Sequence, residues 1–366
     1  MRMKNERIVF LDYLRVAACF MVMVVHAVEP FYFDGSMNLH IATKSDAIWV
    51  SILDSAARAC VPLFVMASCY LLFPLKIPAD AFFRRRVSRI LVPFIIWACV
   101  YIWHFGGSFK ELIFNFPNAA GHLWFVPMLF GLYLVMPLLS PWAEKVEKRE
   151  LRAWIALWLV TAAFPYLRRI APALGVEPSF GPVAFLWGEC PWNEFGAFQY
   201  VSGFSGYMFI ALYLRKSEFS WKKTLAWAVP LFAVGLAIMA SGFYLRIPGG
   251  GEYPVHAPYS AAVDLEMSIE YCSLGVAAAT VALFILFRKF SFDGAFYRWV
   301  VLPFSNASFG AYLIHILILV PVSAALKGTM PMPLCVLAVA GVTFVASMLV
   351  SCAVRRIPLV GKWLMG

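Results

Sequence analysis

The chain has 366 residues, of which 62% are hydrophobic and only 14% charged, and its mean hydropathy is +0.78. A soluble domain of this length carries nearly twice that charged fraction. The composition therefore excludes an ordinary soluble protein and predicts a polytopic membrane protein. The net charge of +10 would suit a nucleic-acid-binding protein, but the placement of the Lys and Arg residues gives it another cause.

Apolar runs of about 20 residues predict membrane-spanning helices. In chain order they cover 8–28, 46–72, 89–105, 122–140, 152–170, 196–214, 223–243, 265–287, 299–323 and 333–354. The predicted fold class is an all-α integral membrane protein of about ten transmembrane helices. Residues 1–366 form a single transmembrane domain without a repeat or an appended soluble domain.

The basic residues predict the orientation of the spans. Of the 30 Lys and Arg residues, 22 lie at the N-terminus or in segments that follow even-numbered spans. By the positive-inside rule both termini are cytoplasmic, and the net charge needs no nucleic acid to explain it. Two loops on the opposite side, 171–195 and 244–264, are rich in Pro, Gly and aromatic residues and suit a lid or a binding surface.

The first span carries three ionisable side chains. His26 follows Arg15 by eleven positions, which on an ideal helix is three turns plus roughly 20° and a rise of about 16 Å. Asp12 lies three residues before Arg15, near the same face. Ionisable groups inside a membrane are costly and usually face a polar interior. The pattern predicts chemistry or transport along this helix.

Each of these residues has a functional and a structural interpretation. His26 has the chemistry of a general base or of a transient acyl carrier, but an interfacial His also hydrogen-bonds to neighbouring helices. Arg15 would hold an anionic ligand, or would pair with Asp12 or Asp54. Asp54 and Arg58, four residues apart in the second span, are expected to form a structural pair.

A basic cluster, Arg84, Arg85, Arg86 and Arg89, opens the third span. It serves as a topology anchor, but closely spaced guanidinium groups also form a strong receptor for phosphates. Coenzyme A carries three phosphates and is available in the cytoplasm.

Other polar residues lie deeper along the chain. His122 and Trp124 begin the fourth span, either as aromatic-belt residues or as contacts for a sugar. Glu266 and Glu270 lie one turn apart in the eighth predicted span. His315 in the ninth span is expected to be a packed polar residue rather than a catalytic one.

No metal site is predicted. The eight cysteines include no CxxC pair, and the His and carboxylate residues lack the spacing of a zinc site. The cysteines are expected to be packing residues, with no disulfide framework.

Several segments together resemble the acyltransferase 3 family of integral-membrane acyltransferases. They are FLDYLRVAACFMVMVVH, with Arg15 and His26 separated by ten residues, then FFRRRVSRILVP, HLWFVPMLFGLYLVMPLL and SFGAYLIH. The resemblance extends from residue 11 to residue 315, and the order of the segments makes it fairly specific. Since the chain ends at Gly366, it resembles the stand-alone type, exemplified by the O-acetyltransferase of enterobacterial common antigen.

This resemblance implies transfer of an acyl group, expected to be acetyl, from cytoplasmic acyl-CoA to a hydroxyl of a noncytoplasmic glycan or glycolipid. The location implied is the bacterial inner membrane. In this reading Arg84, Arg85, Arg86 and Arg89 hold the CoA phosphates, and Arg15 orients the acyl-pantetheine arm with Asp12 beside it. His26 acts on the acceptor, and His122 and Trp124 bind it.

Two other functions fit the residues. A transporter or flippase for an anionic lipid-linked glycan would use the buried charges as a pathway, without needing acyl-CoA. A noncatalytic subunit of an envelope-assembly complex would use them to hold its helices together. The oligomeric state and the acceptor are not encoded in any recognisable pattern.

Overall fold

The computed structural model describes residues 7–108, 110, 121–164, 166–167, 170, 174–175, 179–180, 184–185 and 200–366. The chain folds as two compact units. Unit 1 comprises Met1–Ala27, Pro74–Pro141 and Phe287–Gly366, and unit 2 comprises Val28–Phe73 and Trp142–Leu286. Every described residue predicted for the active site lies in unit 1, so this unit is the one that positions the site.

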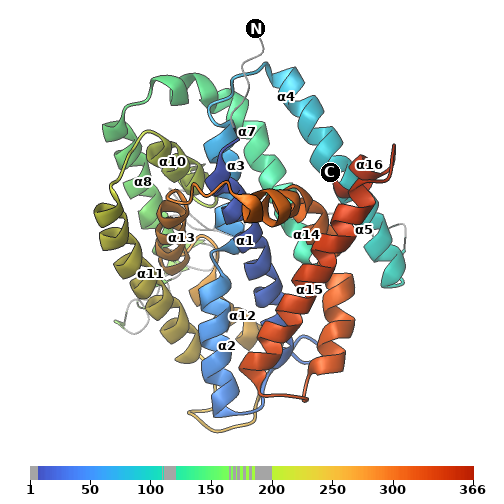
Figure 1. Ribbon diagram of the computed structural model, residues 1–366. Coiled ribbons are helices and arrows are strands. Elements are labelled where there is room, and N and C mark those ends of the chain that lie inside the picture. The colour runs from blue at the N-terminus through green and yellow to red at the C-terminus, as the bar shows by residue number, and fades with distance from the viewer. Residues whose placement is uncertain are drawn as a thin grey trace. The chain divides into compact units, whose positions relative to one another are not determined.

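Unit 1 is built from long apolar helices. They are α1 (Val9–Val28), α4 (Ala79–Arg86), α5 (Val92–His104), α7 (Phe125–Lys145), α14 (Leu302–Leu326), α15 (Met332–Arg355) and α16 (Gly361–Met365), with a 3-10 turn η4 (Gly121–Trp124) before α7. Helices α14 and α15 lie side by side, and the short α16 packs against both and against α5 (Figure 1). The amino end of α1, helix α4 and α16 lie toward the upper part of the unit in that view.

Two π-helical turns interrupt the spans of unit 1. The turn η2 (Val87–Leu91) joins α4 to α5, and the turn η8 (Tyr297–Val301) leads into α14. Each is followed by a proline, Pro93 or Pro303, at the start of the next helix. Because proline has no N–H to donate to the carbonyl four residues earlier, the regular α-helical pattern is lost there. π turns of this kind are frequent at functional sites.

Unit 2 contains a second set of helices and two short β-ribbons. Its helices are α2 (Lys44–Ala57), α3 (Cys60–Leu72), α8 (Lys148–Ala162), α10 (Ser205–Arg215), α11 (Trp221–Tyr244), α12 (Tyr259–Glu266) and α13 (Leu274–Phe287), with 3-10 turns η1 (Glu29–Phe31) and η7 (Met267–Ile269). Strand β1 (Leu39–Ile41) pairs antiparallel with β4 (Val255–Ala257), and β2 (Ser179–Phe180) pairs with β3 (Ala184–Phe185).

The second predicted span contains a two-residue turn at Arg58 and Ala59, between α2 and α3, and Lys44–Leu72 still qualifies as one membrane-spanning segment. The guanidinium of Arg58 donates to Asp54 over 2.7 and 2.9 Å and to Glu266 over 3.2 Å. The predicted pair with Asp54 is therefore confirmed. Glu266 closes α12, and α12 with η7 is bent by 44° from α13, so the predicted single helix over 265–287 is wrong and Glu266 and Glu270 do not share a regular helix.

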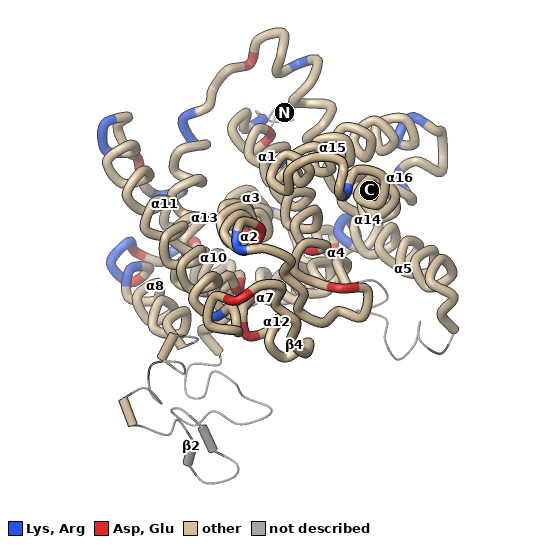
Figure 2. The backbone as a smooth tube through the Cα atoms, turned by 90° about the horizontal axis from the view of Figure 1, so that it is seen from below, with Lys and Arg blue, Asp and Glu red and all other residues tan. Residues whose placement is uncertain are grey.

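The helices agree with an all-α membrane protein. Among the described residues, seven helices are long and apolar enough to cross a membrane, or eight if the bent pair over 259–287 is one span. The predicted spans 152–170 and 196–214 contain the shorter helices α8 and α10, of 15 and 11 residues, and both ranges include residues outside the described part. The total of ten and the side of the termini stay predictions. Figure 2 shows Lys and Arg mainly at helix ends and in loops.

Helices α11 and α13 approach closely at a pair of glycines. A Cβ on Gly235 would lie 2.6 Å from the carbonyl oxygen of Gly275. Small residues at such crossings allow helix backbones to pack tightly in membranes.

Replacing Gly235 with Ala should therefore destabilise unit 2. We expect the free energy of unfolding to fall by about 1–3 kcal/mol, the usual cost of overpacking, measured by thermal unfolding in detergent. Gly131→Ala is the matched control, because no atom lies within 4 Å of its added Cβ. Alanine there should be neutral or stabilising by about 0.5–1 kcal/mol, since glycine is costly inside a helix. Equal stability of the two variants would contradict the close approach.

Candidate active site

The buried carboxylate of Asp12 is the centre of a hydrogen-bond network near the start of α1. Asp12 is 1% exposed. Its Oδ2 accepts from Arg7 Nε (2.6 Å) and Tyr297 Oη (2.7 Å), and its Oδ1 accepts from Arg7 Nη2 (2.9 Å) and Ser305 Oγ (2.6 Å). The network therefore joins α1 to the π turn η8 and to α14.

Arg7 is the principal partner of Asp12, and it was not predicted from the sequence. Its hydrogen bond to Asp12 raises the pKa of Arg7, and its Nη2 also donates to Asn306 Oδ1 over 2.8 Å. The Arg15 guanidinium lies 3.5 Å from Asp12 Oδ1, longer than an ordinary N–H···O hydrogen bond. Asp12 is thus an ion-pair partner of Arg15, as the sequence suggested, but its shortest bonds are made elsewhere.

Arg15 lies close to a second cation, Arg86 from the end of α4. The charge of Arg86 acts on Arg15. The guanidinium carbon of Arg86 is 5.5 Å from the ring centre of Phe82 and 5.7 Å from that of Tyr133. Its Nε is buried, with no hydrogen-bond partner among the described residues. Two guanidinium groups held near each other, one with a donor unused, suit an anionic group between them.

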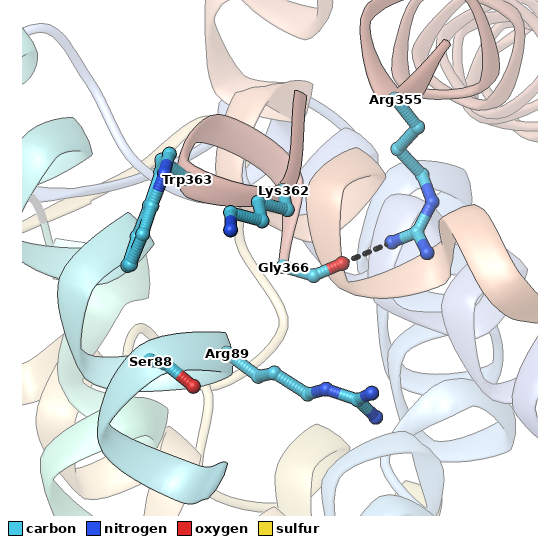
Figure 3. Close-up of a pocket in the computed structure, with 6 residues that line it drawn as sticks. All are labelled: Ser88, Arg89, Arg355, Lys362, Trp363 and Gly366. Atoms are coloured by element: carbon cyan, nitrogen blue, oxygen red, sulfur yellow. Dashed lines mark hydrogen bonds between the residues drawn. The ribbon is translucent and has the colours of Figure 1, made fainter. Parts of the chain in front are cut away.

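The four arginines of the basic cluster do not act as one patch. Arg84 and Arg85 are exposed, whereas Arg86 turns inward toward α7. Arg89 instead lines a pocket of roughly 320 Å³ together with Ser88, Arg355, Lys362, Trp363 and Gly366 (Figure 3). In this pocket Arg355 donates to an oxygen of Gly366. The basic side chains of the pocket therefore come from the π turn η2 and from the C-terminal segment of unit 1.

Three histidines meet near the far end of α1. The ring centre of His26 is 5.1 Å from that of His315 and 6.4 Å from that of His122, and the last two rings are 5.0 Å apart. His122 is 6% exposed and His315 is fully buried, whereas His26 is partly exposed. We call these three residues the histidine cluster. It joins α1, η4 and α14. The approach of these three elements could not be predicted from the sequence.

Tyrosines hold the histidine cluster in place. Tyr312 Oη donates to the backbone oxygen of His122, and Tyr101 Oη donates to the Leu313 carbonyl over 2.9 Å. The Tyr101 ring also meets the His122 ring edge-on, with centres 4.8 Å apart. Tyr312 and His315 belong to SFGAYLIH, so that segment was the sequence signal for this part of the site.

The sequence also predicts Trp124 as an acceptor contact and the loops 171–195 and 244–264 as a lid or a binding surface. Trp124, two residues after His122, is partly exposed and packs edge-on against Phe125. Most of the loop 171–195 lies outside the described residues, and 244–264 contains β4 and α12. Their roles stay predictions.

Among the described residues, no three His, Cys, Asp or Glu side chains are arranged so that they could hold a metal ion. The lack of a metal stays a prediction.

These features define a multi-pass helical membrane protein with cations near one end of α1 and imidazoles near the other. Residues 8–352 match the family model Acyl_transf_3, described as an acyltransferase domain. The chain belongs to this family and is a membrane acyltransferase that transfers groups other than aminoacyl groups. Comparison with curated proteins found no match, and neither did comparison with solved structures.

Asp12→Asn should destabilise unit 1, because it removes the charge that accepts four short hydrogen bonds. The expected loss is about 1–3 kcal/mol, typical for hydrogen bonds to a charged group, measured by thermal unfolding in detergent. The exposed Asp293→Asn is the control and should leave stability within about 0.5 kcal/mol. An Asp12→Asn variant as stable as the wild type would show that the carboxylate charge does not support this packing.

Proposed function

We propose that this acyltransferase moves an acetyl group from cytoplasmic acetyl-CoA to a hydroxyl of a glycan or glycolipid on the other side of the bacterial inner membrane. The observation that carries the proposal is the arrangement along α1. A single helix brings Arg15 near Arg86 and, eleven residues later, His26 into the histidine cluster. The distribution of Lys and Arg supports a cytoplasmic location for the Arg15 end.

The donor side of the proposal rests on the cations. Arg86 and Arg15 would attract the anionic part of the CoA molecule. Arg89, Arg355 and Lys362 would add positive charge in the pocket that they line. The partial exposure of Arg15, 26% of its side chain, keeps it accessible to a ligand. Arg84 and Arg85 would contribute a weaker attraction, because they are exposed and salt screens their charges.

The acceptor side rests on His26. In direct transfer, His26 takes the proton of the acceptor hydroxyl as the hydroxyl oxygen bonds to the acyl carbon. The carbon–sulfur bond to CoA then breaks, and the proton ends on the CoA thiolate. In the two-step alternative, a ring nitrogen of His26 carries the acyl group before the hydroxyl receives it. His122 and Trp124 would contact the acceptor in either scheme.

Acetyl-CoA binding tests the donor side. Arg86→Ala should weaken binding by about 10- to 100-fold, the loss expected when a hydrogen bond to a charged group is removed, measured by calorimetry on the detergent-solubilised protein. Arg84→Ala/Arg85→Ala should have a smaller effect, and the triple change of Arg84, Arg85 and Arg86 the largest.

Arg152→Ala is the matched control, because this exposed arginine lies on α8 in unit 2. It should bind acetyl-CoA like the wild type. Folded wild-type protein that does not bind acetyl-CoA would contradict the donor assignment, and transport of an anionic glycan intermediate would become the better proposal.

His26→Ala tests the acceptor side. We expect transfer of labelled acetyl groups from acetyl-CoA to the membrane glycan fraction to fall by about 10²- to 10⁴-fold, the range for loss of a general acid–base group. Acetyl-CoA affinity should stay within about twofold, since the cations are about 16 Å away along the helix. Wild-type transfer by this variant would overturn the role of His26.

A further inference from the structure

The protonation of His315 follows from its hydrogen bond. Its Nδ1 lies 2.6 Å from the backbone oxygen of Tyr312. A carbonyl oxygen can only accept, so Nδ1 carries the hydrogen and Nε2 of the neutral ring has a lone pair. That Nε2 is fully buried and has no hydrogen-bond partner among the described residues. An unused acceptor in a membrane interior is costly, and this one lies beside the ring of His26.

His122 is the second neighbour of His26, and its Nε2 is also buried with no hydrogen-bond partner among the described residues. His315 is the nearer neighbour of His26, with ring centres 5.1 Å apart against 6.4 Å for His122. A separation of 5.1 Å between the ring centres of His26 and His315 is compatible with an N–H···N hydrogen bond between the two rings.

We propose that His315 is a positioning residue for the transfer reaction: its Nε2 accepts the N–H of His26, so the other ring nitrogen of His26 is held unprotonated toward the acceptor hydroxyl. The effect of His315 on catalysis rests on the proposed function. The contact between His26 and His315 can be measured without any acyl transfer. The hydroxyl proton moves to His26, which becomes an imidazolium held by His315. No proton needs to leave the cluster until it passes to the CoA thiolate.

A purely structural role would place the important bond at the other nitrogen. The Nδ1 bond of His315 reaches only three residues back on its own helix, so it does not join α14 to another element. If His315 served only to satisfy that carbonyl, an Asn side chain, whose amide nitrogen occupies the position of Nδ1, would replace it well. The proposal instead requires an acceptor at the position of Nε2, which the longer Gln side chain can supply.

The paired variants His315→Gln and His315→Asn therefore give opposite expectations. We expect His315→Asn to lower kcat by about 10²-fold at unchanged KM for acetyl-CoA, and His315→Gln to retain kcat within about tenfold of the wild type. The exposed His104 on α5 gives the control pair, His104→Asn and His104→Gln, both with wild-type kcat. Asn outperforming Gln at position 315, or a rise in KM alone, would overturn the proposal.

A second measurement uses the unmutated protein, so it does not depend on folding of a variant or on activity. Solid-state NMR of histidine labelled with ¹⁵N should show His315 protonated only at Nδ1, and a scalar coupling across an N–H···N bond between His26 and His315. Protonation of His315 at Nε2, or absence of that coupling, would overturn the positioning role. If the coupling is present but the wild type transfers no acetyl group, the proposed function is overturned, whereas the contact between His26 and His315 is confirmed.

Discussion

The packing of unit 1 depends on one buried negative charge. Removing a carboxylate from water is costly unless its oxygens are fully bonded, and Asp12 meets this condition with donors from Arg7, Tyr297 and Ser305. These donors come from the segment before α1, from a π turn and from α14. The desolvated charge thus determines where the first helix lies against a helix nearly 300 residues later. Because α14 also carries His315, the same interaction positions the histidine cluster.

The polar groups along α1 are separated by kind. Arg7 and Arg15 lie beside Asp12, whereas the imidazoles meet eleven residues beyond Arg15. Under the proposed function, a separation of about 16 Å would place anion attraction and proton transfer at different depths of the membrane. The donor and the acceptor would then be recognised by groups that do not compete. Buried charge in unit 2 is used differently, since Asp54 accepts from Arg58 and the same guanidinium also donates to Glu266.

The features that could be predicted from the sequence depend on the spacing of residues along a single helix. Asp12, Arg15 and His26 do lie on one uninterrupted helix, and Asp54 pairs with Arg58 four residues away. Both conclusions need only the period of the α-helix. The approach of His122 and His315 to His26, and the choice of Arg7 as the partner of Asp12, depend on packing between distant segments, which a hydropathy pattern does not encode. The short turn at Arg58 was not predicted because the residues on both sides are apolar and continue the run.

The π turn between α4 and α5 has a consequence for how this segment can vary. Each residue of an α-helix turns the side chains by about 100°, and a π turn inserts one extra residue into that rotation. The number of residues in Val87–Leu91, and not only their identity, therefore fixes the direction of Arg86 around the helix axis relative to α5. Loss of a single residue there would restore an α-helical path and rotate Arg86 away from Tyr133. The position of Arg86 therefore depends more strictly on the length of this turn than on the identity of its side chains.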